Sequence, residues 1–229
     1  ALLRICGDDS LNFLQGQFSN DLRDLERGPG MYGLWLNVKG KVTADSFVIS
    51  GGPNEYWVVS YWSAGALIRD RLEKFVIADD VVIEDCSGDG AGVTVFGPPL
   101  RSPPANAGVV SFVGRRALQP CLEWVHPATP ANEAVVAAAL VGWTELPPAT
   151  MEQLRVAARL PAVPVDIGPG DLPNEGGLDQ TAVSYGKGCY LGQEVMARLK
   201  TMGQVRRRLL GVRGGGSIPP LPAALYDGE

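Results

Sequence analysis

Glycine and proline interrupt this chain at short intervals. The 229 residues include 29 glycines and 18 prolines, nearly twice the usual share of these two residues together. Because both residues break helices and strands, we expect short elements joined by many turns. The Pro- and Gly-rich run from Pro161 to Gly177 cannot form regular structure over its whole length. This pattern favours a mixed α and β fold.

Eight short apolar runs have the composition of strands. Residues 31–37 and 42–50 predict a hairpin, because Gly40 supplies the residue that a left-handed turn position requires. The predicted strands are 2–6, 31–37, 42–50, 55–62, 81–85, 92–96, 109–113 and 121–125.

Helical spacing of apolar residues, preceded by capping residues, predicts four helices before residue 161. The third has a threonine before a proline at its first position, and the fourth has a capping box over residues 150–153. The predicted caps are Asp8, Asp9 or Ser10, then Ser63, Thr129 and Thr150.

The order of these elements suggests two domains. Between Tyr56 and Trp143 the chain runs strand, helix, several strands, helix, which suits one antiparallel sheet with helices on one face. The flanking segments then look like two halves of a second domain. The sequence stops at Glu229 soon after a Pro-rich turn, so we expect an incomplete C-terminal unit.

Charge and hydropathy exclude several classes of partner. The chain has 20 Lys and Arg against 25 Asp and Glu, a net charge of −5, and such an acidic chain attracts phosphate backbones poorly. No run approaches the roughly 18 apolar residues of a membrane helix, and no N-terminal signal pattern is present. We therefore predict no nucleic-acid or membrane partner, and a cytoplasmic location, or the mitochondrial matrix in a eukaryote.

Residues that ligate metals are sparse. His126 is the one histidine, and the four cysteines lie 80, 35 and 68 residues apart, without the local spacing of a zinc or thioredoxin-like motif. We predict no metal site and no disulfide framework. Three cysteines fall in predicted strands and are interpreted as core, namely Cys6, Cys86 and Cys121.

A glycine-punctuated turn runs into a helix over residues 185–200. Glu194 and Arg198 stand four residues apart, a spacing that by itself indicates a solvated salt bridge. Cys189 lies near the predicted helix start, two residues from Lys187. The helix dipole and the ammonium would both favour a thiolate, whereas a lone cysteine is otherwise a small buried apolar residue. Spacing alone leaves both interpretations open.

Basic residues concentrate in the same part of the chain. Residues 187–213 contain seven basic side chains and one acid, Glu194. This segment therefore carries a charge of +6 and the rest of the chain −11. A small polyanion suits this patch better than nucleic acid, and a strand with exposed arginines is the alternative. The basic residues are Lys187, Arg198, Lys200, Arg206, Arg207, Arg208 and Arg213.

The run from Lys187 to Glu194, followed by Arg198, resembles the K-G-C-Y-x-G-Q-E-x-x-x-R signature of the YgfZ-type folate-binding proteins. That family is related to the glycine-cleavage T-protein, an aminomethyltransferase, and includes a mitochondrial iron–sulfur assembly factor. Residues 13–22, 36–45 and 202–212 are similar to the family's N-terminal motif, its hairpin and the strand after the signature.

The resemblance implies an α+β, T-protein-like cloverleaf around a tetrahydrofolate pocket. Residues 1–45 and 145–203 would form a split folate-binding domain, with an inserted ferredoxin-like domain over residues 46–144. Residues 204–229 would start a C-terminal β-barrel that the sequence leaves incomplete.

The pterin ring of a folate needs a carboxylate partner, because its 2-amino group and ring N–H can donate two parallel hydrogen bonds. In the aminomethyltransferases that acid lies where this chain has Ala157. We predict Glu175 as its substitute, the alternative being an exposed loop glutamate. An acidic pair of the aminomethyltransferases is reduced here to Ala44-Asp45, so Asp45 remains as the single catalytic carboxylate.

The resemblance therefore implies a tetrahydrofolate-binding accessory protein for iron–sulfur cluster assembly or repair, in which Cys189 is a redox-sensitive or transiently metal-binding thiol. A folate-dependent aminomethyltransferase or related C1 transferase is one alternative, and a scaffold that has lost folate binding is another. The cofactor would be tetrahydrofolate or a 5-substituted folate. The partners would be the iron–sulfur assembly machinery or its client proteins, and we expect a monomer.

The residues of the implied site fall into two groups. Cys189 and Asp45 are the catalytic candidates. The candidate folate contacts are Asn20, Glu175, Lys187, Tyr190, Gln193, Glu194 and Arg198.

Overall fold

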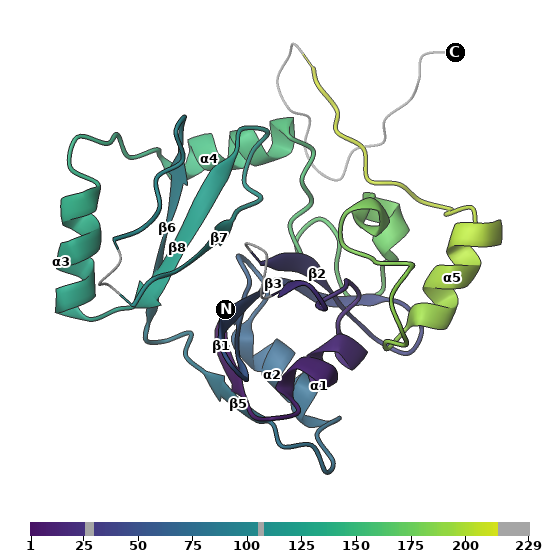
Figure 1. Ribbon diagram of the computed structural model, residues 1–229. Coiled ribbons are helices and arrows are strands. Elements are labelled where there is room, and N and C mark those ends of the chain that lie inside the picture. The colour runs from purple at the N-terminus through teal and green to yellow at the C-terminus, as the bar shows by residue number, and fades with distance from the viewer. Residues whose placement is uncertain (26–29, 105–107, 215–229) are drawn as a thin grey trace.

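The computed structural model describes residues 1–25, 30–104 and 108–214, which form two antiparallel sheets with helices around them (Figure 1). The strands are β1 (Leu2–Cys6), β2 (Met31–Leu36), β3 (Val42–Gly52), β4 (Glu55–Val59), β5 (Val82–Asp85), β6 (Gly90–Phe96), β7 (Val110–Val113) and β8 (Cys121–Pro127). The helices are α1 (Ser10–Gln17), α2 (Gly65–Glu73), α3 (Pro130–Ala139), α4 (Pro148–Ala157) and α5 (Gln193–Met202), with 3₁₀ turns η2 (Pro173–Gly176) and η3 (Leu178–Gln180).

The larger sheet has the strand order β2-β3-β4-β1-β5, and the smaller has the order β6-β8-β7. In the β2–β3 hairpin, Gly40 has the predicted left-handed conformation, with φ of 67°. All the strand pairs are antiparallel. Mixed helices and antiparallel sheets agree with the predicted α+β class.

Strand pairing does not follow the predicted boundary at residue 45. That boundary falls inside β3, and both β4 and β5 pair with β1. The strands of the predicted inserted domain, 46–144, are therefore divided between the two sheets. They do not form one ferredoxin-like sheet, nor the single sheet expected from Tyr56 to Trp143, because β1 offers hydrogen-bonding partners on both of its edges.

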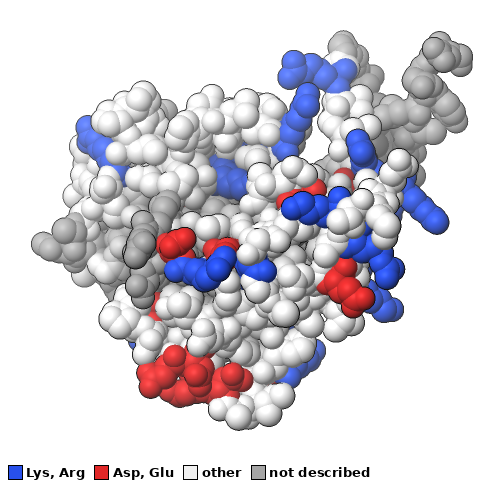
Figure 2. Space-filling model, turned by 45° about the vertical axis from the view of Figure 1, so that its right-hand side comes forward, with Lys and Arg blue, Asp and Glu red and all other residues white. Residues whose placement is uncertain are grey.

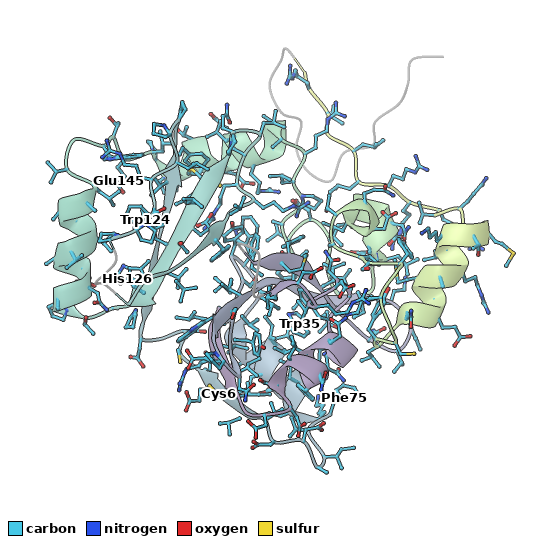
Figure 3. The ribbon with its side chains drawn as sticks, viewed as in Figure 1. Cys6, Trp35, Phe75, Trp124, His126 and Glu145 are labelled. Atoms are coloured by element: carbon cyan, nitrogen blue, oxygen red, sulfur yellow. The ribbon has the colours of Figure 1, made fainter. Side chains whose placement is uncertain are left out.

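Alternating side chains cover both faces of the larger sheet. On one face, residues such as Trp35 and Val48 pack with α1 and α2. On the other, Leu34 and Leu36 pack with the chain from Val163 to Met196, and Phe47 packs with Phe112 of the smaller sheet, their ring centroids 4.7 Å apart. Figure 3 shows Trp35 inside the larger-sheet lobe and Trp124 between β8 and α3.

Two of the predicted helix caps are wrong. The N-cap of α2 is Ala64, while the Ser63 hydroxyl bonds to the Asp45 carboxylate instead. Helix α4 begins at Pro148 with Pro147 as its N-cap, so Thr150 lies inside the first turn. Proline at the first helical position favours this earlier start because its φ is already helical.

The first and third helices start at predicted positions. Asp9 is the N-cap of α1, but its side chain makes no capping bond and accepts from the Asp80 amide. The Thr129 hydroxyl caps α3 by accepting from the Asn132 amide at 3.3 Å, as predicted. Only the third cap therefore works through the expected side-chain bond.

The chain after α5 is irregular where it is described. Residues 204–214 contain no strand, so this part of the predicted barrel start is not formed, and residues 215–229 lie outside the described residues. Within the described residues, no helix combines the length and apolar character needed to cross a membrane.

Candidate functional site

The Lys187 side chain is buried and fixes the signature segment onto the end of α1. Its ammonium donates to the backbone oxygens of Gln15, Phe18 and Asn20, each at 2.8 Å. Burial lowers the pKa of Lys187 to about 8, so it stays mostly charged at neutral pH. An ammonium has three donors, and all three are used. Lys187 is therefore a clamp that joins the signature segment to the end of α1, and an ionised Cys189 thiol stays a prediction.

Tyr190 is the second buried residue of the signature. Its ring lies 5.2 Å from the Lys187 ammonium and packs in the core between the larger sheet and α5. Burial raises the pKa of Tyr190 to about 12, and its hydroxyl has no hydrogen-bond partner among the described residues. A side chain placed in this way supports the core and does not face a ligand cavity.

The other signature residues lie at the surface. Cys189, Glu194 and Arg198 are exposed, and Gln193 is half-buried. Within the described part of the chain, no ion pair joins Glu194 to Arg198. The predicted salt bridge is therefore absent from this structure, and Cys189 is an accessible free thiol.

Two glycines let the β2–β3 turn rest on the start of α5. Gly192 has φ of 89°, and a Cβ there would lie 2.7 Å from the Asn37 carbonyl oxygen. A Cβ on Gly40 would lie 2.9 Å from Val195 Cβ. Both positions therefore exclude a side chain, which is why two motifs about 150 residues apart each carry glycine.

Asn20 connects strand β2 to the segment before the signature. Its amide donates to the carbonyl oxygens of Tyr32 at 2.9 Å and Thr181 at 3.3 Å, and its Oδ1 accepts from the Asp21 amide. These contacts saturate the Asn20 side chain with backbone groups. Its role in the structure is to join segments, not to face a cavity.

Asp45 is buried inside the molecule and is fully hydrogen-bonded. Its Oδ1 accepts from the hydroxyls of Ser60 at 3.0 Å and Ser63 at 2.9 Å, and its Oδ2 accepts from the Tyr32 hydroxyl at 2.9 Å. Burial raises its pKa although these bonds act in the opposite direction. The predicted catalytic carboxylate is thus held by three hydroxyl groups, and it does not line the cavity described next.

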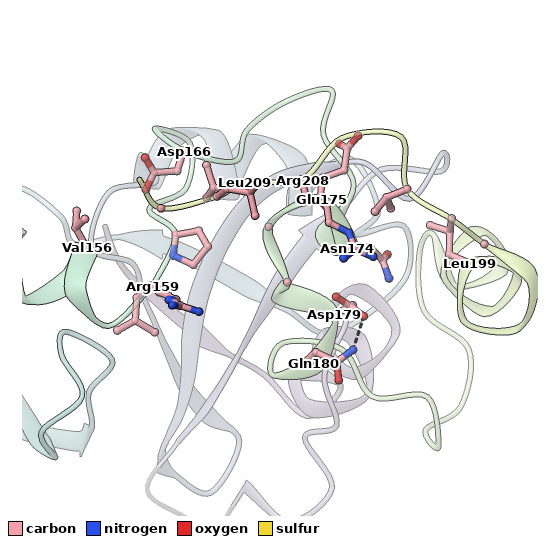
Figure 4. A pocket seen from close by; sticks show the side chains of 18 of the residues that line it. Val156, Arg159, Asp166, Asn174, Glu175, Asp179, Gln180, Leu199, Arg208 and Leu209 are labelled. Carbon is pink, nitrogen blue, oxygen red and sulfur yellow. Dashed lines mark hydrogen bonds between the residues drawn. The ribbon is translucent and has the colours of Figure 1, made fainter. Parts of the chain in front are cut away.

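A cavity of about 780 Å³ lies between α4, the turns η2 and η3, the end of α5 and the segment from Gly203 to Gly211 (Figure 4). Val156 and Arg159 lie on one side of it, and Leu199 lies on the other. Its apolar lining side chains are Val156, Leu160, Pro161, Leu199, Val205, Leu209 and Leu210.

Glu175 is the buried carboxylate of this cavity. Its side chain is 9% exposed, so the alternative of an exposed loop glutamate is wrong. Oε2 accepts from the Leu172 amide at 2.8 Å. Arg207 donates from Nε to Oε1 at 3.2 Å and from Nη2 to Oε2 at 3.3 Å, and also to Asp171 Oδ1 at 2.9 Å. The local turn fixes the carboxylate, and an arginine from the C-terminal segment covers it.

The other arginines of the cavity differ in how they are paired. Arg155 is buried and bound to Glu152 and, at 2.6 Å, to Asp166. Arg159 and Arg208 are exposed, and no ion pair holds either of them within the described residues. Figure 2 shows basic side chains gathered over α5 and the C-terminal segment, the side on which this cavity lies. The cavity therefore joins one buried acid to two uncommitted cations.

Of the seven predicted folate contacts, Glu175 is the one that lines the cavity. Lys187 and Asn20 meet each other through a backbone oxygen, and Tyr32 connects Asn20 to Asp45. Sequence reasoning did not find the hydroxyl set around Asp45 or the pairing of Glu175 with Arg207. Serines and tyrosines in strands give no sequence signal that they will surround a carboxylate. The run of three arginines at 206–208 contains Arg207, the partner of Glu175.

Comparisons with known proteins agree with this fold. The family model of the GCVT N-terminal domain matches residues 2–102. The protein named iron-sulfur cluster assembly factor IBA57, mitochondrial, of Homo sapiens is 28% identical over 97% of this chain and 66% of its own length. Its homologue in Mycosarcoma maydis is 26% identical over 99% of this chain and 58% of its own length.

A bacterial relative and a solved structure complete the comparison. The tRNA-modifying protein YgfZ of Cronobacter sakazakii is 25% identical over 97% of this chain and 71% of its own length. The glycine cleavage system aminomethyltransferase T of Bartonella henselae has a TM-score of 0.69 at 18% identity, over 87% of this chain and 60% of that one. Residues 2–102 therefore match the GCVT N-terminal domain, and along nearly its whole length the chain, with its signature at residues 187–198, is similar to proteins named IBA57 and YgfZ.

Proposed function

We propose that this protein binds a reduced folate in the cavity beside Glu175 and serves as an accessory protein in iron–sulfur cluster assembly or repair. The observation that carries the folate assignment is a buried carboxylate, Glu175, in the wall of a cavity of about 780 Å³. Small-molecule sites typically occupy about 300–1,000 Å³ and combine apolar walls with a few placed polar groups.

The lining residues suit the parts of a folate. The Glu175 carboxylate can accept the paired N–H donors of the pterin ring. Apolar surface for the rings comes from Val156, Leu160, Pro161 and Leu199. Arg159 is free to meet a carboxylate of the glutamate tail. A bound tetrahydrofolate would supply a carrier for one-carbon groups.

The proposed cellular role comes from the relatives. Two of them are named as mitochondrial iron–sulfur cluster assembly factors, and the bacterial one is named as a tRNA-modifying protein. The chain spans 58% of the Mycosarcoma maydis relative. Under this proposal the partners are the iron–sulfur machinery or its clients, and the exposed Cys189 thiol is available to them. The cytoplasmic or matrix location, the monomeric state and the lack of a nucleic-acid partner stay predictions.

A folate-dependent transferase is the second candidate, favoured by the similarity of fold to an aminomethyltransferase. Aminomethyl transfer needs a positioned carboxylate near the reacting nitrogen. Asp45 is held by three hydroxyls and lies away from the cavity lining. The geometry therefore supports binding better than catalysis.

Anaerobic calorimetric titration with tetrahydrofolate and 5-formyl-tetrahydrofolate tests the folate site. We expect micromolar binding that falls at least about tenfold in Glu175→Gln, since a charge-assisted bidentate contact is lost. Asp45→Asn, a buried carboxylate outside the cavity, and Cys189→Ala are the matched controls and should bind like the wild type. Loss of binding in Asp45→Asn with full binding in Glu175→Gln would place the site elsewhere.

The iron–sulfur role needs a separate test in cells. The activity of a [4Fe–4S] enzyme is measured in a strain that lacks its own relative of this chain, with and without this protein. We expect the wild type to restore the activity and Cys189→Ala to fail. Equal restoration by Cys189→Ala would remove the thiol from the proposal.

A further inference from the structure

Glu175 already has a ligand inside the molecule, and that ligand comes from the segment Gly203–Gly211, here called the strap. We propose that Arg207 of the strap is an internal competitor, which occupies the Glu175 carboxylate until a ligand with the same pattern of donors displaces it. This inference rests on the proposed folate site and adds the regulation of that site.

The contact of Arg207 with Glu175 has the form of a fork. Nε donates to Oε1 at 3.2 Å and Nη2 donates to Oε2 at 3.3 Å, so two parallel N–H groups meet two carboxylate oxygens. The Leu172 amide approaches Oε2 as well. The edge of the carboxylate that accepts two donors at once is therefore filled by the guanidinium.

A pterin ring presents the same chemical unit. Its ring N–H, the carbon beside it and the 2-amino group form a cyclic guanidine, which offers two parallel N–H donors in one plane. The fork of an arginine has this same planar arrangement. Two such groups cannot occupy one carboxylate edge together, so binding of the pterin at Glu175 requires that Arg207 leaves.

The strap is attached weakly enough to leave. Among the described residues, the main chain from 204 to 211 makes one backbone hydrogen bond to the rest of the protein. The Leu209 amide donates to the backbone carbonyl oxygen of Glu175 at 2.7 Å. The Arg207 side chain is 67% exposed, and water and salt weaken an ion pair of that kind. Of the two leucines of the strap, Leu210 is 76% exposed and Leu209 is 45% exposed.

The arrangement also explains how a buried carboxylate persists without a ligand. Burial of an unpaired charge is costly, and Arg207 removes that cost while the cavity is empty. An exchange between two guanidine-type partners keeps Glu175 paired in both states. The site then discriminates against ligands that lack an amino group beside a ring N–H.

Calorimetric titration of the full chain with 5-formyl-tetrahydrofolate tests the competition. Arg207→Ala is compared with Arg206→Ala, since Arg206 is an exposed neighbour without an ion pair in the described residues. We expect Arg207→Ala to bind about threefold more tightly, the size of an exposed ion pair, and Arg206→Ala to match the wild type. Guanidinium chloride should weaken binding by Arg207→Ala more than an equal concentration of sodium chloride does.

Hydrogen exchange reports whether the strap is released, which a measurement of affinity does not. Saturating ligand should speed exchange of the Leu209 amide in the wild type, because the strap is released. Wild-type binding with no gain in Arg207→Ala, or with unchanged Leu209 exchange, overturns the competition and leaves the folate site standing. If neither the wild type nor Arg207→Ala binds the folate, both the folate site and the competition by Arg207 are overturned.

Discussion

Asp45 and Glu175 are both buried carboxylates, yet they differ in what holds them. Asp45 accepts from three hydroxyls that belong to strands or adjoin them in the interior, and none of these donors can leave without disrupting the core. Glu175 accepts from one amide of its own turn and from an arginine on an exposed segment. The difference shows that burial alone does not make a carboxylate a binding group. A binding group needs a partner that can be exchanged.

The cations show the same contrast. Arg71 is buried, donates from Nε and Nη2 to the Leu36 oxygen at 3.1 and 2.7 Å, and lies over the Trp35 ring. Lys187 is committed to three backbone oxygens. Arg207 instead remains largely in solvent. We distinguish these as an interior region and a rim region, and the following changes test that distinction.

Lys187→Met should have the largest effect. It leaves three buried carbonyl oxygens without their donor, and we expect a loss of about 3 kcal/mol in the free energy of unfolding. Urea denaturation measures the change. Lys39→Met is the control, because Lys39 is exposed and its side chain has no partner among the described residues. Equal stability of the two variants would place Lys187 in the rim region.

Gly192→Ala should rank second. The residue must adopt a positive φ, and the new Cβ would lie 2.7 Å from the Asn37 oxygen, so we expect a loss of about 2 kcal/mol in unfolding free energy. Gly188→Ala is the matched control in the same signature, since a Cβ there meets no atom within 4 Å. A similar melting temperature for both variants would contradict the close contact between the turn and α5.

The pH dependence of stability should separate Asp45 from an exposed acid. Its pKa is raised in the folded state by burial, so the folded form binds the proton more tightly than the unfolded form. Its contribution to stability is present below the ordinary aspartate pKa and is lost as the pH rises through the raised value. The stability of the wild type relative to Asp45→Asn should therefore fall from about pH 4 upward. A difference that grows with pH in urea titrations would refute the assignment.

Arg207→Ala should have the smallest effect on folding. Its ion pairs are exposed on the arginine side, and such pairs contribute little to stability. We expect at most a small fall in the urea midpoint, because Glu175 keeps the Leu172 amide as a partner, although ligand affinity changes as proposed above. A clear loss of stability would mean that the strap is part of the core.

Local features of this fold could be predicted from sequence, and long-range ones could not. The hairpin at Gly40 and the cap at Thr129 depend on residues a few positions apart, and both were predicted. Ser63 was misassigned as a cap because its actual partner, Asp45, lies 18 residues earlier, in β3. Sequence spacing also put Lys187 beside Cys189, whereas folding brings Lys187 to residues 15–20.

In the candidate site, too, long-range pairings could not be predicted from the sequence. The need of a pterin for a carboxylate led to Glu175, and the local charge led to the arginines. Six further predicted folate contacts do not line the cavity. Glu175 pairs with Arg207, 32 residues away, and no local pattern encodes that pairing. The signature is in large part a structural motif, since Lys187, Tyr190 and Gly192 all serve packing or hydrogen bonding.

The hydrogen bonds of Lys187 can form only late in synthesis. A ribosome releases the chain from its N-terminus, so the carbonyl groups of Gln15, Phe18 and Asn20 emerge about 170 residues before the ammonium that they accept from. Until then water must solvate them, and the face of the larger sheet that packs on residues 163–196 still lacks Tyr190 and Met196. Nascent chains that stall before residue 187 therefore lack the donor for these three carbonyl groups.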